Sequence, residues 1–237
     1  MKKVFFILFI LISIFSFSQE KRNCGTNERL DHYRQSHPES IAKSNDLEKK
    51  IQKWIKQNVN AKTSAITIPV VVHVVYKNNS ENISDAQIHT QIDVLNEDFR
   101  RLNQDASNTP FDFLPYAADM QIEFCLAKRY LGVPTTGIDR KQTNLAEFPL
   151  YSDSVFFTNF GGSSAWNTNR YLNIWVCDIA GTIMGWAQFP GSGNSQTDGI
   201  VIDYERFGTF GTVSQPYHKG RTTTHEVGHW LSLFHPW

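Results

Sequence analysis

The sequence has no excess of charge of either sign and no internal repeat. It carries 23 Lys and Arg against 23 Asp and Glu in 237 residues, and no basic patch is interleaved with aromatic residues. Because nucleic-acid binding depends on a basic surface that neutralises phosphates, this balance removes the electrostatic case for such a partner. Hydrophobic residues make up 41% of the chain, enough for the core of one large domain or two small ones.

Cysteine is scarce, with only Cys24, Cys125 and Cys177. An odd count in an exported protein leaves at least one thiol outside any intramolecular disulfide. Cys125 and Cys177 lie in apolar, strand-like contexts, so each is expected to be a small buried hydrophobe, with its disulfide status left open. Cys24 differs, because it lies in a polar stretch near the N-terminus.

The first 18 residues have the pattern of a signal peptide. Lys2 and Lys3 are followed by an apolar run over 4–17, and Ser16 and Ser18 suit a cleavage site after Ser18. The run is too short for a comfortable membrane span, which disfavours the alternative of an uncleaved anchor. The mature chain is therefore expected to be secreted, with no stable membrane association.

The mature chain is expected to begin with a polar segment over 19–62. Within it, Leu47, Ile51, Trp54 and Ile55 recur at helical spacing and predict a helix over 44–57. The composition changes at Ile66. The β-branched run over 68–76 predicts a strand buried on both faces, with His73 as a satisfied core histidine rather than a metal ligand.

Further elements are predicted along residues 84–230. Ser84 and Gln87 form a capping box before a helix, whose buried face is expected to comprise Ile88, Ile92, Leu95, Phe99 and Leu102. Strands are predicted over 121–127, 171–178, 182–189 and 199–204, with loop between the first two and an edge strand around 185–190. A final helix begins near Thr222 or Thr223. This order predicts an α/β (α+β) fold, a twisted sheet with helices packed on it.

The last residues of the chain carry a metal-ligand pattern. His225 and His229 lie four residues apart on that final helix, so both imidazoles face one way. Glu226 lies beside them and suits a general base acting on a metal-bound water. His235 reaches the same metal only if the helix stops near Ser232 and the chain turns back, and Pro236 prevents the helix from continuing. Three protein ligands with one open position are typical of catalytic Zn2+.

The motif HEVGHWLSLFH resembles the extended zinc signature HExxHxxGxxH of metzincin metalloproteases. Its flanking residues are similar to those of the pappalysin group, and the resemblance extends over roughly 66–237. It implies a metzincin-type upper subdomain, with a mixed five-stranded sheet, two long helices and an antiparallel edge strand along the substrate. We place Gly185, Trp186 and Ala187 in that strand. The resemblance also implies protein or peptide substrates and Zn2+, and it leaves room for Ca2+ without naming a site.

The sequence departs from the family pattern in two places. Ser232 stands where the family has a glycine, at a turn that often needs a positive φ, which costs a non-glycine residue about 1–2 kcal/mol. The chain also ends two residues after His235. The lower subdomain is therefore expected to be missing, and residues 63–237 to be an incomplete catalytic domain with little or no proteolytic activity of its own.

Cys24 resembles the cysteine that some metzincin pro-segments place on the zinc. Gly25 would let the backbone pass close to a crowded cleft, and a thiolate is a strong ligand for zinc. We therefore expect residues 19–62 to be a pro-segment that holds a zymogen latent through Cys24. The alternatives are a free surface thiol or a disulfide to Cys125 or Cys177.

These observations favour a secreted zinc-dependent endopeptidase in which Glu226 is the general base. One alternative is a non-catalytic exported fragment or binding module with a vestigial zinc site. Another is a thermolysin-like peptidase, but that class takes a downstream Glu as its third ligand and no residue follows Trp237.

Overall fold

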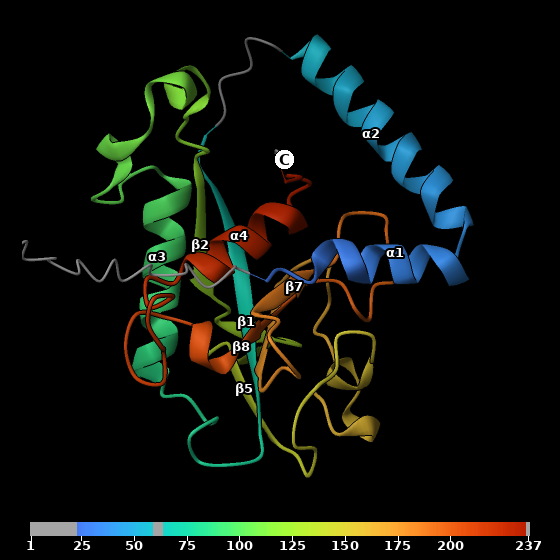
Figure 1. Cartoon of the computed structure of the whole chain (residues 1–237), viewed down its shortest axis with the longest axis vertical. Helices are drawn as coiled ribbons and strands as arrows, with labels where there is room; N and C mark the ends of the chain where they lie inside the picture. The colour runs from blue at the N-terminus through green and yellow to red at the C-terminus, as the bar shows by residue number, and fades with distance from the viewer. Residues whose placement is uncertain (1–22, 59–63, 236–237) are drawn as a thin grey trace, which may run out of the picture.

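The computed structural model describes residues 23–58 and 64–235 (Figure 1). The predicted signal peptide, its cleavage site, the predicted boundary near residue 62 and Pro236 lie outside these ranges. Within them, no helix is both long enough and apolar enough to cross a membrane.

A mixed sheet forms the centre of the molecule. Its strands are β1 (Ile66–Tyr76), β2 (Ile122–Leu126), β5 (Ile138–Gln142), β6 (Leu172–Cys177), β7 (Gly185–Ala187) and β8 (Ile200–Asp203). The order is β2-β1-β6-β8-β7, and every pairing is parallel except that of β7 with β8. The predicted α/β (α+β) fold with an antiparallel edge strand is therefore confirmed.

The sheet is covered on both faces, as the β-branched run over 68–76 predicts. On one face Val70, Val72 and Val74 pack against helix α3 (Asp85–Phe99), and helix α4 (Arg221–Trp230) lies beside α3 (Figure 1). On the other face Val75 belongs to a second core cluster that includes Trp175 and Trp186. The alternation follows from the two-residue period of a strand, which sends successive side chains to opposite faces.

The prediction that residues 128–170 form only loop is wrong. β5 pairs in parallel with the second half of β1, beyond the point where β2 ends. Its residues, Asp139, Arg140 and Lys141 among them, are too polar to show a strand pattern. They form one because the long β1 leaves backbone groups there that need partners. This stretch also contains the small hairpin of β3 (Arg129–Tyr130) and β4 (Val133–Pro134).

Several short 3₁₀ turns connect these elements: η1 (Ala106–Asn108), η2 (Phe111–Tyr116), η3 (Ser154–Phe156), η4 (Thr158–Phe160) and η5 (Tyr204–Arg206).

Helix α3 departs from prediction at both ends. Ser84 accepts the predicted hydrogen bond from the backbone N–H of Gln87, at 3.1 Å. The Gln87 amide does not return to Ser84, however, and donates instead to the Phe207 carbonyl and to Thr212, so the capping box is half formed. The helix stops at Phe99 and leaves Leu102 72% exposed, outside the predicted buried face.

Two helices precede the sheet. α2 (Glu39–Gln57) contains the predicted helix and begins five residues earlier, whereas α1 (Thr26–Ser36) was not predicted. α1 lies across the edge of the sheet at β7, and α2 extends away from the body (Figure 1). Because α2 projects, Trp54 and Ile55 remain exposed despite their helical spacing.

His73 and two of the cysteines have structural environments. The His73 ring is fully buried and contacts Asn173, Ser163 and Asp139, which confirms a satisfied core histidine. Cys177 is buried, as predicted, and burial raises the pKa of its thiol. Cys125 is only half-buried, because β2 is an edge strand. Neither cysteine forms a disulfide.

Candidate active site

Helix α4 is held at its start by a buried glutamine of α3. The Gln91 amide donates to the Gly220 carbonyl at 3.0 Å and accepts from the Thr223 hydroxyl at 2.9 Å. Two turns further along α3, Asp98 accepts a hydrogen bond from the Thr224 hydroxyl at 2.7 Å. These contacts fix the first turn of α4, and with it the direction in which the next two turns present their side chains.

The chain leaves α4 through the predicted turn. The helix ends at Trp230, and Ser232 has a φ of +74°. The backbone N–H of Leu233 then donates to the Gly228 carbonyl at 2.9 Å, which closes the helix. Ser232 therefore takes the left-handed conformation expected at this position, and the turn returns His235 toward the helix.

Three imidazoles converge at this turn. The Nε2 atoms of His225 and His229 are 3.0 Å apart, those of His225 and His235 are 3.0 Å apart, and those of His229 and His235 are 3.1 Å apart. Nδ1 of His229 lies 2.7 Å from the Leu233 carbonyl, which can only accept, so a neutral His229 carries its proton on Nδ1. Burial lowers the pKa of His229 and favours that neutral form, whose bare Nε2 points at the other two rings.

The arrangement fits a zinc ion. Zn–N bonds of about 2.0–2.1 Å in a tetrahedral site place two ligating nitrogens roughly 3.3 Å apart, close to the observed separations. Three imidazole nitrogens in mutual contact cannot all be satisfied by hydrogen bonds among themselves, whereas one cation accepts a lone pair from each. Within the described residues, the only group of three or more potential ligands that meets in this way comprises Cys24, His225, His229 and His235.

Glu226 lies beside this cluster and is almost fully buried, with 1% of its surface exposed. Its Oε2 accepts a hydrogen bond from the Thr26 hydroxyl at 2.8 Å and lies 3.6 Å from Cys24 Sγ. Gly185 makes room for it, because a Cβ on Gly185 would lie 3.2 Å from Glu226 Cγ and 2.9 Å from the Val201 carbonyl oxygen.

Cys24 lies at the open side of the imidazoles. Its Sγ is 3.6 Å from His229 Nε2, a separation that a shared tetrahedral zinc would give with Zn–S near 2.3 Å, roughly 3.6 Å. Burial, reinforced by the neighbouring Glu226 carboxylate, raises the pKa of the Cys24 thiol to about 12. The crowding expected at Gly25 is present too, since a Cβ there would lie 2.6 Å from Leu150 Cδ1.

The N-terminal segment covers the free edge of β7. Gly25 N–H donates to the Gly185 carbonyl at 2.9 Å, and Met184 N–H donates to the Asn23 carbonyl at 3.0 Å. Cys24 and Gly185 form a parallel bridge, so the segment runs in the same direction as the strand. The N-terminal segment thus joins the predicted edge strand to the cluster, with Cys24 paired to Gly185 and in contact with His229.

Comparison with known proteins agrees with this geometry. The peptidase family M43 model, described as pregnancy-associated plasma protein-A, matches residues 158–237. The structure of a promirolysin mutant from Tannerella forsythia superposes on this chain with a TM-score of 0.81 and a sequence identity of 47%. The match covers 91% of this chain and 70% of the promirolysin chain. The chain belongs to the M43 family of metallopeptidases.

Other relatives match a smaller share of the chain. Mature mirolysin of Tannerella forsythia, solved with a cleaved peptide, is 55% identical over 74% of this chain and 66% of its own, with a TM-score of 0.72. Proteins named extracellular metalloprotease from Arthroderma otae and Pyricularia oryzae are 28% and 29% identical over 73% and 74% of this chain. The chain spans about half the length of these curated relatives, 53% and 52%.

Sequence reasoning missed two residues at the M43 site. Thr26 bridges Glu226 and the edge strand, since its hydroxyl also accepts a hydrogen bond from the Ala187 backbone N–H at 2.8 Å. Arg29, one helical turn later, docks α1 onto the body. No local pattern marks either of them. The available signal was the position of Thr26 two residues after Cys24, which places it near whatever Cys24 contacts.

The turn at Ser232 yields a test of stability. Replacing Ser232 with glycine removes about 1–2 kcal/mol of left-handed backbone strain from the folded state, which stabilises the protein. It also gives the unfolded chain more conformational entropy, which destabilises the protein by roughly 0.5–1 kcal/mol. Ser232→Gly is therefore expected to raise the free energy of unfolding by about 0.5–1 kcal/mol in urea titrations at saturating zinc. Ser44→Gly, inside α2, serves as the control and should lower it. A loss of stability in Ser232→Gly would show that this turn is unstrained.

Proposed function

We propose that this chain is the catalytic part and pro-segment of a secreted zinc metalloendopeptidase, in the latent form. The observation that carries the proposal is the convergence of three imidazole Nε2 atoms beside the buried carboxylate of Glu226, at a sheet edge. M43 membership supports it. Because the chain spans only part of its relatives, the activity and substrates of the whole protein belong to this proposal.

His225, His229 and His235 would hold the zinc. When bound there, zinc supplies Lewis acidity that polarises the scissile carbonyl and makes water a better nucleophile near neutral pH. Each histidine is positioned by a separate contact. Gln91 fixes the start of α4, which carries His225. The Leu233 carbonyl orients the His229 ring, and the turn at Ser232 places His235. These restraints orient the rings toward one point.

Glu226 would move the proton. Its carboxylate lies next to the histidines but on the side of β7, where the peptide to be cleaved would lie. From there it can remove a proton from the attacking water and return it to the leaving amine. Its intact, buried position counts against a vestigial or purely structural zinc site, which has no use for a carboxylate at this point.

The free edge of β7 would bind the substrate backbone. The Gly185 carbonyl and the Ala187 N–H point out of the sheet, and the N-terminal segment already uses both. An extended peptide can pair with such an edge as an added strand, which holds its backbone irrespective of its side chains. The edge strand thereby aligns a peptide bond over the histidines.

The N-terminal segment would keep the enzyme latent. Cys24 takes the open side of the metal cluster, Thr26 engages Glu226, and Gly25 covers Gly185. Each group that catalysis needs thus has a partner from this segment. The parallel direction of the segment also differs from the antiparallel pairing that an added strand favours.

The division at residues 18 and 62 remains part of the proposal. We assign 1–18 to a signal peptide, 19–62 to the pro-segment and 63–237 to the catalytic domain. The match to mature mirolysin covers 74% of this chain, which is the share that residues 63–237 occupy. The match to promirolysin covers 91%, so it must also include part of the proposed pro-segment or signal peptide. Relatives named as extracellular support export.

The role of Glu226 can be separated from that of the zinc ligands. In the full-length protein freed of its N-terminal segment, Glu226→Ala should keep one zinc per molecule and lose 10²–10⁴-fold in kcat on a peptide substrate, roughly the contribution of a general base. Glu147→Ala, at an exposed acidic residue, is the control and should cleave normally. Activity of Glu226→Ala within about tenfold of wild type would remove Glu226 from the mechanism.

Latency should depend on two contacts. In the full-length protein, Cys24→Ala should produce basal peptidase activity without cleavage near residue 62, because the metal site becomes accessible. Adding Thr26→Val should raise that activity further, because Glu226 and the Ala187 N–H are then released, while Thr26→Ser should not. Cys125→Ala is the control and should stay latent. If Cys24→Ala is as silent as the parent until trimmed, Cys24 does not hold the enzyme latent.

A further inference from the structure

Arg29 of α1 inserts its guanidinium into a cage on the body of the protein. Nη1 donates to the Leu150 carbonyl at 2.5 Å, and Nη2 pairs with the Asp153 carboxylate. The guanidinium carbon lies 5.2 Å from the ring centre of Phe156 and 5.5 Å from that of Trp186. Carbonyl, carboxylate and two aromatic faces together form what we name the guanidinium cage, and it leaves the Arg29 side chain only 17% exposed.

The cage belongs to the body and not to the N-terminal segment. Phe156 and Trp186 are 2% and 1% exposed and pack in the core cluster on that face of the sheet, with Leu150 beside them. The segment that follows Leu150 leads into η3 and includes Phe156. Its turns are closed by backbone hydrogen bonds within the segment itself, such as that from Phe156 N–H to the Asp153 carbonyl. The cage therefore does not need α1 to keep its shape, and removing α1 would leave an arginine site without its arginine.

The position of the cage relates it to the substrate edge. Trp186 is the central residue of β7, between Gly185, which lies against Glu226, and Ala187, which binds Thr26. Along this edge Cys24, which lies on the histidines, pairs with Gly185, and Thr26, two residues later, pairs with Ala187, so the Gly185 end of β7 is the end at the metal cluster. A peptide paired antiparallel to it would run toward the cluster, so its residues near Ala187 would precede the bond to be cleaved.

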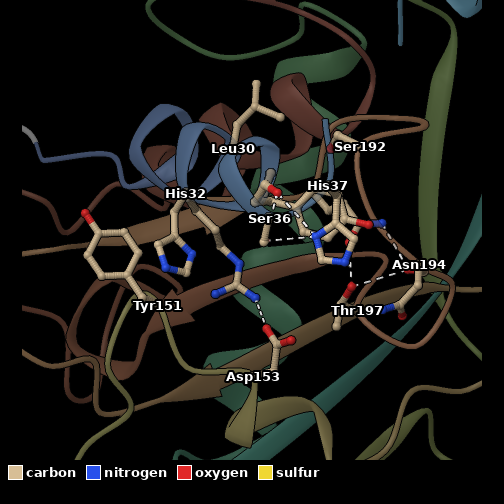
Figure 2. Close-up of a pocket in the computed structure, with 13 residues that line it drawn as sticks. Leu30, His32, Ser36, His37, Tyr151, Asp153, Ser192, Asn194 and Thr197 are labelled. Carbon is tan, nitrogen blue, oxygen red and sulfur yellow. Dashed lines mark hydrogen bonds and ion pairs between the residues drawn. The ribbon is translucent and has the colours of Figure 1, made fainter. Parts of the chain in front are cut away.

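There is also space beside the cage. A cavity of about 270 Å³ lies between α1 and the loop that follows β7, lined among others by Arg29, Asp153, Ala187, Asn194 and Thr197. In Figure 2, Tyr151 and His32 lie at one end of this cavity, Asn194 and Thr197 at the other, and Asp153 between them. The groove along β7 is thus only partly filled by the segment that covers it.

We propose that, once the N-terminal segment is removed, the guanidinium cage binds an arginine side chain of the substrate on the N-terminal side of the cleaved bond. Asp153 is then a specificity-determining residue, and Arg29 occupies in the latent form the site that a substrate arginine takes in the active form. The inference rests on the proposed peptidase function. A planar guanidinium suits this cage better than an ammonium, because it can donate in a fork and stack on aromatic faces at once.

The test compares peptides that differ at one position. The activated full-length protein is given peptides with arginine, citrulline or norleucine two, three or four residues before the cleaved bond. Citrulline keeps the shape of arginine and loses its charge. At one of these positions, kcat/KM for arginine is expected to exceed that for citrulline about tenfold, as a charge-assisted, partly desolvated contact would give. Asp153→Asn should abolish this preference, and Asp112→Asn, at an exposed acidic residue, should keep it.

A binding measurement distinguishes the cage from the peptidase function. The indole N–H of Trp186 is buried without a hydrogen-bond partner, so its NMR resonance reports on the cage. In the activated protein it should shift with N-acetylarginine amide and not with N-acetylnorleucine amide. Equal cleavage of arginine and citrulline peptides, or a preference that survives Asp153→Asn, would overturn the inference. A Trp186 shift without cleavage of any peptide would instead contradict the peptidase function and leave the cage as a guanidinium site.

Discussion

The close approach of three imidazole nitrogens, within 3.1 Å of one another, constrains the rest of the structure. Such lone pairs tolerate this proximity only when a cation or a proton lies among them. Two of the rings need only the four-residue period of α4, but the third requires the chain to stop and reverse at once. That requirement accounts for the left-handed Ser232, for the hydrogen bond from Leu233 N–H to Gly228, and for the carbonyl that orients His229.

The same constraint reaches the opposite side of the cleft. Because Glu226 follows His225 directly, its carboxylate is forced toward β7, and only a residue without a Cβ fits opposite it at Gly185. The N-terminal segment then meets the site with Cys24 on the histidines, Thr26 on Glu226 and Arg29 in the guanidinium cage. Three contacts within one short stretch of chain thus lie on the histidines, on Glu226 and beside β7. In the proposed zymogen these contacts would let a mostly polar segment cover the metal ligands, the base and the substrate edge together.

Local patterns predicted those parts of the molecule whose causes are local. The buried strand over 68–76, the pairing of His225 with His229, and the turn at Ser232 all follow from nearest-neighbour geometry. Contacts that join distant segments were not predictable in this way. Thr26 meets Glu226 across 200 residues of sequence, and Gln87 abandons its capping box for Phe207 and Thr212. β5 is a strand because β1 is long enough to need a second partner, a cause that lies outside its own polar residues.

The most direct test of this account is the metal content of the purified full-length protein and of its His229→Ala variant. We predict one zinc per molecule in the parent and at least a hundredfold weaker zinc binding in His229→Ala, because a two-histidine remnant cannot complete the site. His37→Ala, at an exposed histidine on the N-terminal segment, should keep the parental stoichiometry. Full zinc occupancy with unchanged affinity in His229→Ala would contradict the assignment of the three histidines as the metal site.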